Sequence, residues 1–149
     1  MGSRDLNIKN RKASFEYQLI ETYTAGIQLT GTEIKSVREG KVSIAEAFCV
    51  FIGQELWVKN MDIAPYRLGH ESNHEPKRLR KLLLHKEELR KIFSRHKEKG
   101  LALIPLRMFI SDRGLAKLDI ALAKGKKIYD KRESIRLKEV KKQMKNRQE

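Results

Sequence analysis

His70, Glu71 and His74 reproduce the spacing H-E-x-x-H of zinc hydrolases. On a helix, this spacing places two imidazoles on one face to bind the metal, with the glutamate as general base. The neighbouring residues disfavour a helix, because Gly69 precedes the motif and Pro76 follows it almost at once. The segment is therefore interpreted as a polar loop, and a zinc hydrolase is kept only as a minor alternative.

Catalytic side-chain sets of other kinds are also missing from the sequence. It contains no serine–histidine–aspartate set, no phosphate-binding loop and no close pair of carboxylates. The single cysteine, Cys49, excludes an internal disulfide and a cysteine-rich zinc site, and it is expected to be a small core residue. The sequence therefore predicts a protein that is not an enzyme and uses no cofactor, metal or small-molecule substrate.

Basic residues cluster where they could contact phosphates. Lys77, Arg78, Arg80 and Lys81 place four cations within five residues, and the leucines at 82–84 would fix this run to the folded domain. Cations held in place in this way suit the backbone phosphates of a structured RNA. The run therefore predicts an RNA-binding patch rather than a merely solvated charged segment.

A second basic pair, Arg11 and Lys12, precedes two aromatic residues, Phe15 and Tyr17. Cations beside exposed aromatic rings are the usual combination for phosphate contact and base stacking. The alternation of a strand would place both rings on one face. The pattern leaves open whether that face meets RNA or the core.

The charge of the whole chain also favours an anionic partner. The 149 residues include 33 Lys+Arg and 19 Asp+Glu, which gives a formal net charge of +14. Such an excess opposes compaction unless a polyanion neutralises it, so nucleic acid is the first partner to consider and an anionic membrane surface the second. No apolar run approaches the roughly 18 residues of a membrane span, and no apolar signal core follows the first residues. A cytoplasmic protein is expected.

Half of this excess lies in residues 124–149, which have few large apolar side chains. This segment cannot build a core, so it is expected to be a basic C-terminal tail that orders only on a partner. One face of a helix in the tail would hold Leu137, Val140 and Met144. The Lys and Arg side chains on the rest of that helix would repel one another, and a polyanion would relieve this repulsion. The tail lacks the wide apolar face of a membrane-surface helix, which disfavours the membrane.

Residues 1–123 show the strand and helix signals of one domain. Three hairpins are predicted where aromatic and β-branched runs flank short turn sequences: residues 15–23 with 27–30, 48–52 with 56–59, and 101–110 with 115–122. Thr30 and Glu33 form a capping box that would begin a short helix, and apolar spacing predicts a second helix over 86–99. The expected fold is mainly β with α: an OB-like closed β-barrel of about six strands, two flanking helices and the basic tail.

Several motifs, taken together and in order, resemble those of the SmpB family, the SsrA-binding proteins that partner transfer-messenger RNA (tmRNA) in bacterial ribosome rescue. The resemblance extends from residue 10 to about residue 144. The motifs are NRKA at 10–13, GTEIKSVR at 31–38, RKLLL at 80–84, KG at 99–100, AKGKK at 123–127 and DKR at 130–132. The resemblance implies a non-enzymatic adaptor whose OB-like barrel binds the tRNA-like domain of tmRNA.

The resemblance also implies which residues and partners are involved. The complex, charged with alanine and carried by elongation factor Tu, would enter a stalled ribosome, where the tail occupies the decoding centre of the small subunit and the empty mRNA channel. It places Tyr17, Glu33, Lys35, Leu83 and Lys117 on the RNA-binding surface. The basic clusters add Arg11, Lys12, Arg38, Arg80, Lys81, Lys124, Lys126 and Lys127. In the tail, it implies ribosomal roles for Tyr129, Asp130, Lys131, Arg132 and Met144.

Three positions depart from the family pattern: Phe15, Thr24 and Gln143 stand where members commonly have histidine, glutamate and an apolar residue. A ribosomal protein or a general structured-RNA-binding barrel is the alternative reading of the same charge pattern, since it differs only in its partner.

Overall fold

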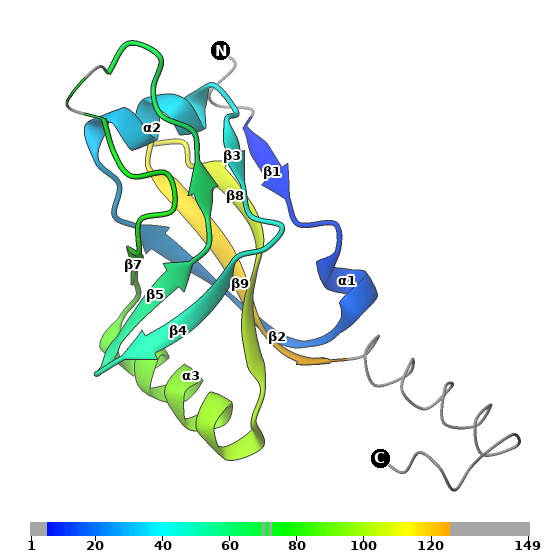
Figure 1. Cartoon of the computed structure of the whole chain (residues 1–149). Coiled ribbons are helices and arrows are strands. Elements are labelled where there is room, and N and C mark those ends of the chain that lie inside the picture. Colours follow the sequence, from blue (N-terminus) through cyan, green and yellow to red (C-terminus); the bar gives the residue numbers. More distant parts are fainter. Residues whose placement is uncertain (1–5, 70, 72, 126–149) are drawn as a thin grey trace, which may run out of the picture.

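The structure is a computed structural model, and it describes residues 6–69, 71 and 73–125. The described part is mainly β with a few helices, as the sequence predicts (Figure 1). Its elements are β1 (Asn7–Lys9), α1 (Ala13–Glu16), β2 (Tyr17–Ile27), α2 (Gly31–Arg38), β3 (Val42–Ser43), β4 (Phe48–Ile52), β5 (Glu55–Lys59), β6 (Asp62–Ile63), β7 (Arg80–Leu83), α3 (Lys86–Lys99), β8 (Ala102–Ile110) and β9 (Ala116–Gly125).

Seven strands form one antiparallel sheet in the order β1-β8-β9-β2-β7-β5-β4, and β3 pairs with β6 in a separate two-stranded sheet. The predicted closed barrel is not confirmed, because the larger sheet is open between its two outermost strands. The short strand β1 covers the edge of β8 only at residues 107–109. The remainder of that edge faces β4 without a strand partner, and side chains of both strands line the same hollow there.

The predicted hairpin between residues 15–23 and 27–30 is wrong, because β2 continues without a turn through Ala25 and Gly26. Ala25 is completely buried in the core. At Gly26, an added Cβ would lie only 3.5 Å from the Cβ of Leu83 on β7. Ala25 therefore packs in the core, and Gly26 lies in an extended strand within ordinary contact distance of Leu83, so neither residue marks a turn. The irregularity in β2 lies earlier, as a shift of register between Leu19 and Glu21.

The two other predicted hairpins are confirmed. β4 and β5 are joined at Gly53, which has a φ of +66°, and β8 and β9 are joined through Gly114, which has a φ of +83°. Both angles lie in the left-handed region that glycine adopts without a steric penalty. Local turn chemistry was therefore sufficient to predict both connections.

The two predicted helices are also confirmed as α2 and α3. The Thr30 hydroxyl accepts from the Glu33 amide, and the Glu33 carboxylate accepts from the Thr30 amide at 2.9 Å, which completes the capping box of α2. Gly100 ends α3 in the left-handed conformation. The third helix, α1, has only four residues and was not predicted. None of the described helices is long and apolar enough to cross a bilayer.

The core fills the inside of the curled sheet, and a helix lies at each end of it (Figure 1). Val37 of α2 and Ile92 of α3 are both completely buried against it, and each such side chain contributes about 1.5–3 kcal/mol. Cys49 is a buried core residue, as predicted, and burial raises the pKa of its thiol to about 12. The thiol is therefore protonated at neutral pH and chemically inert.

Candidate RNA interface

Four residues from four neighbouring strands lie in one row across the outside of the sheet. Leu83 on β7 is opposite Gly26 on β2, Gly26 is opposite Lys117 on β9, and Lys117 is opposite Phe109 on β8. Directly opposed residues of antiparallel strands point to the same face, and Leu83 is 46% exposed. The structure therefore brings the predicted residues Leu83 and Lys117 to either side of Gly26, with the Leu83 side chain packed beside the glycine.

A second row lies two residues further along the strands β2, β9 and β8, and it fixes an arginine beside the first row. Arg107 Nε donates to Asp119 Oδ2 at 2.8 Å, and the Thr24 hydroxyl donates to Asp119 Oδ1 at 2.6 Å. The Arg107 guanidinium also lies over the Phe109 ring, 4.1 Å from its centroid. The two rows, Leu83, Gly26, Lys117 and Phe109 with Thr24, Asp119 and Arg107, are called the outer sheet face below.

Arg107 and Phe109 were not among the predicted site residues. The available signal was their spacing, since residues two apart on a strand point to the same face. A cation stacked on an aromatic ring is held without loss of its donors. The outer sheet face thus combines a fixed guanidinium, a lysine and an aromatic ring, which suits phosphate contact and base stacking.

A second cluster of predicted residues surrounds α1, where β9 reaches its last residue. Arg11 and Lys12 are exposed, and Lys12 Nζ forms an ion pair with Glu46 at 2.8 Å. Tyr17 is half-buried against the small cluster under α1, and Lys124 is exposed. The first residue of β2 pairs with the last residue of β9, which brings the two strand ends together. Lys124 is opposite Gln18, so it points to the other face of the sheet from Tyr17.

Phe15 and Tyr17 do not share one environment, which the sequence left open. Phe15 lies on α1 and is 67% exposed, whereas Tyr17 begins β2 and is half-buried. The four-residue helix separates the two rings, so the strand alternation assumed from the sequence does not apply to them.

Lys35 and Arg38 lie on α2, at the end of the sheet opposite α3 (Figure 1). Both side chains are exposed. The Lys35 ammonium lies 5.5 Å from the centroid of the Tyr66 ring, and Arg38 Nη2 donates to the Gly114 carbonyl at 3.3 Å. They form a third basic region, separate from the cluster around α1.

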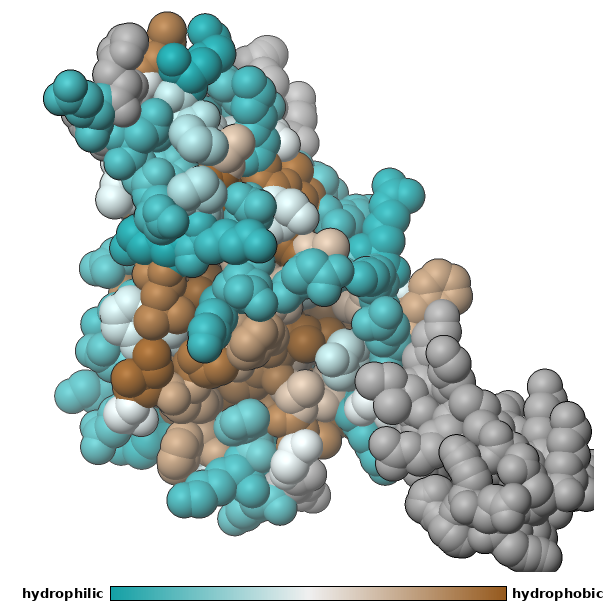
Figure 2. Space-filling model, in the orientation of Figure 1, coloured by the Kyte–Doolittle hydropathy of each residue, from teal (hydrophilic) through white to brown (hydrophobic). Residues whose placement is uncertain are grey.

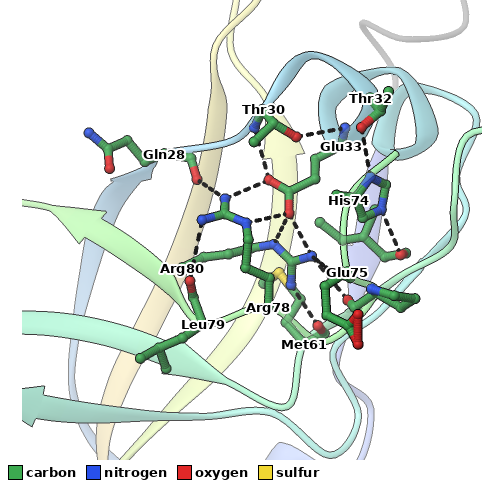
Figure 3. A network of polar contacts seen from close by, with 12 residues as sticks. Gln28, Thr30, Thr32, Glu33, Met61, His74, Glu75, Arg78, Leu79 and Arg80 are labelled. Carbon is green, nitrogen blue, oxygen red and sulfur yellow. Dashed lines mark hydrogen bonds and ion pairs between the residues drawn. The ribbon is translucent and has the colours of Figure 1, made fainter. Parts of the chain in front are cut away.

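Glu33 and Arg80 lie inside the fold, at the centre of a buried polar network (Figure 3). Glu33 Oε2 accepts from Arg80 Nε at 2.8 Å and from Arg78 Nε at 2.9 Å, and its Oε1 accepts from Arg78 Nη2 at 2.7 Å. Arg80 also donates to the carbonyls of Met61 and Pro76, at 2.7 and 3.0 Å. The network joins α2 to β7 and to the segment that precedes β7.

The charges of this network persist at neutral pH. Burial alone would raise the pKa of Glu33, but hydrogen bonds from Arg78, from the Thr30 amide and from Arg80 lower it to about 2. Burial lowers the pKa of Arg80, and its bond to Glu33 opposes that effect. The pair is therefore ionised, with each charge satisfied inside the protein.

The predicted contact of Glu33 and Arg80 with RNA stays a prediction, and in the free chain both residues have a structural role. Both side chains are completely buried, so neither has a surface that an RNA could reach in this structure. They position α2 and β7 instead. Lys81, the next residue of β7, is half-buried and pairs with Glu55 at 2.9 Å, which leaves its other donors available.

The H-E-x-x-H segment is a loop where the structure describes it, and its second histidine supports the fold. His74 Nε2 lies 2.9 Å from the Ile63 carbonyl oxygen, and its Nδ1 lies 2.9 Å from the Thr32 hydroxyl. A carbonyl can only accept, so Nε2 carries the proton and Nδ1 accepts. Within the described residues, no group of three metal-ligating side chains occurs; His70 is outside them.

The predicted tail residues cannot be placed in this way. β9 continues to Gly125, two residues beyond the predicted domain boundary. The remaining predicted residues lie outside the described part of the chain: Lys126, Lys127, Tyr129, Asp130, Lys131, Arg132 and Met144.

A curled antiparallel sheet whose outer face carries a fixed arginine and a lysine beside an aromatic ring, in a chain of net charge +14, is typical of a β-sheet nucleic-acid-binding protein. The family model described as SmpB protein matches residues 7–149. The chain therefore belongs to the SmpB family.

Curated relatives are similar to the chain over nearly all of its length. The SsrA-binding protein of Cytophaga hutchinsonii is 57% identical over 141 residues, covering 95% of this chain and 92% of that protein. The SsrA-binding protein of Bacteroides thetaiotaomicron is 56% identical over 144 residues, covering 97% of this chain and 96% of that protein.

A solved structure shares both fold and sequence with the chain. It is described as "tmRNA-SmpB: a journey to the center of the bacterial ribosome". The matching chain is 45% identical, and the TM-score is 0.71 over 93% of this chain and 96% of that one. This similarity confirms the family resemblance seen in the sequence motifs.

Proposed function

We propose that the chain is a non-catalytic adaptor that binds the tRNA-like domain of tmRNA and delivers it to stalled ribosomes for trans-translation. The observation that carries this proposal is the similarity to a chain of a tmRNA–SmpB structure. That chain is 45% identical with a TM-score of 0.71, and the match covers 93% of the present chain. The SsrA-binding relatives support the same function at more than half identity.

The outer sheet face is the proposed site for the folded RNA. Structured RNA is recognised mainly through its shape, its phosphates and its 2′-hydroxyls. Lys117 supplies one cation for phosphate, and Arg107, which is held by Asp119 and Phe109, supplies another. Leu83, whose side chain packs beside Gly26, supplies an apolar contact next to these cations.

The cluster around α1 is the proposed second contact. Arg11, Lys12 and Tyr17 lie on or next to α1, and Lys124 lies on the neighbouring end of β9, on the other face of the sheet from Tyr17. Cations at this place would guide RNA along the side of the sheet towards the basic tail.

The curled sheet with a helix at each end supports an OB-like arrangement, open between β4 and β8.

The tail is the proposed ribosomal signal. Residues 124–149 would enter the decoding centre of the small subunit and the empty mRNA channel, where rRNA neutralises their charge. Elongation factor Tu would carry the alanine-charged complex, and the cytoplasm is the compartment in which all these partners meet. The sheet would then supply RNA affinity and the tail would supply recognition of the ribosome.

A competition gel shift tests the proposed function. The labelled tRNA-like domain is bound to the full chain and challenged with an equal mass of unstructured RNA at several salt concentrations. The proposal expects the complex with the tRNA-like domain to resist the competitor. Its affinity should fall steeply with salt: log affinity should drop by about 0.7–0.9 per phosphate contact for each tenfold rise in salt concentration. Equal competition by unstructured RNA would favour a general RNA-binding protein instead.

A further inference from the structure

Two apolar hollows lie side by side where α3 packs under the β4–β5 hairpin. The first, of about 650 Å³, lies between β4 and β8, and the second, of about 740 Å³, lies between β7 and α3. Phe51 and Phe93 line both hollows, and their rings meet edge to face with centroids 5.0 Å apart. In Figure 2, apolar surface extends over β4, β5 and α3 with hydrophilic side chains around it.

Aromatic rings are accessible in this region. Phe93 is 40% exposed and Phe48, at the entrance of the first hollow, is 38% exposed. Tyr17 lines the same hollow. Exposed aromatic rings are the platforms on which proteins stack unpaired bases.

One stripe of α3 supplies cations along both hollows. Lys86, Arg90, Phe93 and Lys97 follow the spacing i, i+4, i+7 and i+11, so they share one helix face. All four are exposed, and all four line one or both hollows. Lys97 Nζ lies 5.6 Å from the centroid of the Phe93 ring. These cations and the ring are called the α3 stripe.

The α3 stripe has no acidic partner in the described part of the chain. None of Lys86, Arg90 and Lys97 takes part in a salt bridge there. The one acidic residue that lines either hollow, Glu55, is paired with Lys81 at 2.9 Å. The region is therefore apolar with an unneutralised cationic border, which is complementary to an anionic, ring-bearing ligand.

We propose that the α3 stripe and its two hollows bind unpaired RNA, with phosphates on Lys86, Arg90 and Lys97 and bases stacked on Phe93 and Phe48. Lys86 and Lys97 are about 16 Å apart along the helix at 1.5 Å per residue. A stacked strand rises about 3.4 Å per nucleotide, so the stripe spans about five nucleotides. This length falls within the range bound by single small β-barrel domains.

This site goes beyond the proposed function, which concerns a folded RNA on the outer sheet face. The two surfaces meet at Leu83, which belongs to the outer sheet face and also lines the second hollow. An RNA with a folded part and an adjoining unpaired segment could therefore occupy both at once. Its two contacts differ in chemistry, since only the α3 stripe offers an apolar hollow for bases.

The test measures binding of a fluorescent oligouridylate of about eight nucleotides to the full chain by anisotropy over a series of salt concentrations. One variant neutralises the stripe, with Lys86→Gln, Arg90→Gln and Lys97→Gln. The control variant removes the same charge elsewhere, with Lys41→Gln, Arg67→Gln and Arg113→Gln, all exposed residues outside the proposed RNA contacts. Both retain the basic tail, so any binding by the tail is common to them.

The stripe variant should lower the slope of log affinity against log salt by about 2, which corresponds to three phosphate contacts of a single strand. The control variant should leave the slope nearly unchanged. Phe93→Leu keeps an apolar contact for Phe51 and should weaken binding at least about fivefold without altering the slope. Thermal melting of each variant confirms that α3 is folded.

Equal slopes of log affinity against log salt for the stripe and control variants would overturn the inference. The hollows would then be better suited to binding an apolar protein segment. An unchanged affinity of Phe93→Leu would overturn the stacking part of it. The tRNA-like domain is measured in parallel, and the stripe variant should bind it within about threefold of the wild type. Failure of the wild type to bind that domain would contradict the proposed function alone.

Discussion

Glu33 on α2 and Arg80 on β7 are 47 positions apart in the sequence, and their side chains meet at 2.8 Å with no exposed surface on either. Arg78 adds two further bonds to the same carboxylate from the edge of the network. A buried ion pair contributes little net stability when intact, but it is costly to break, because one charge is left without a partner. The pair therefore holds α2 in place relative to the sheet.

Replacing Glu33 tests this role. Glu33→Gln should lower the free energy of unfolding by about 3–5 kcal/mol, since Arg80 would remain charged and buried. Urea denaturation followed by circular dichroism measures the change. Glu39→Gln is the control, because its ion pairs with Lys41 and Arg67 are at the surface, and it should cost no more than about 1 kcal/mol. Equal losses would contradict the positioning role.

The same pair makes stability depend on pH in the acid range. The pKa of Glu33 is lowered from 4.5 to about 2 in the folded chain. A carboxylate with a depressed folded pKa stabilises the protein above its unfolded pKa, and this contribution is lost as the pH falls through the folded value. The wild type should therefore lose stability between about pH 4.5 and pH 2. Glu33→Gln should lack this part of the loss. If the free energy of unfolding of both proteins fell in parallel with pH, the role of Glu33 in acid stability would be refuted.

Gly26 and Gly53 should respond differently to alanine. Gly26 lies in an extended strand, where an added Cβ would be 3.5 Å from Leu83, an ordinary contact. Gly53 has a φ of +66°, which an L-residue adopts only with strain. Gly53→Ala should cost about 1–2 kcal/mol, whereas Gly26→Ala should be neutral or slightly stabilising. A large loss at Gly26 in urea denaturation would mean that β2 is broken there.

Arg107 should contribute strongly to binding of the tRNA-like domain, because its guanidinium is already held in place before RNA arrives. Arg107→Gln should weaken binding by about tenfold and lower the salt slope by about 0.7–0.9, as expected for one phosphate contact. Arg113→Gln, an exposed arginine in the β8–β9 turn, is the control and should have little effect. Filter binding over a salt series would measure both, and a similar loss at Arg113 would show that only total charge matters.

Removing the tail should separate RNA binding from ribosomal function. Truncation after Gly125 keeps β9 whole, so binding of the tRNA-like domain should stay within a few-fold of the full chain. Peptide tagging on stalled ribosomes in a reconstituted translation system should be abolished. Loss of both activities together would contradict the division between sheet and tail.

The sequence predicted those features that depend on neighbouring residues. The turns at Gly53 and Gly114 and the capping box of Thr30 with Glu33 arise from local geometry, and the structure has all of them. Ala25 and Gly26 resemble a turn only when the chain is read alone. In the fold both lie within one continuous strand, whose partners β7 and β9 are far away in the sequence.

The candidate site was predictable in the same limited sense. Leu83 and Lys117 were expected on one surface, and strand pairing across Gly26 explains why they meet. The family resemblance placed Glu33 on the RNA-binding surface, but no local pattern showed that its charge is buried against Arg80, which is distant in the sequence. Arg107 was missed because its value depends on Asp119 and Phe109 holding it from two sides.

The most direct test of the whole account is to purify the tagged chain from its native host and identify the RNA that accompanies it. The account predicts that tmRNA is the main RNA bound by the wild type, and that a variant with Arg107→Gln and Lys117→Gln retains much less of it while remaining folded. Recovery of no tmRNA, or of the same amount with the variant, would contradict the claim that the outer sheet face binds this RNA.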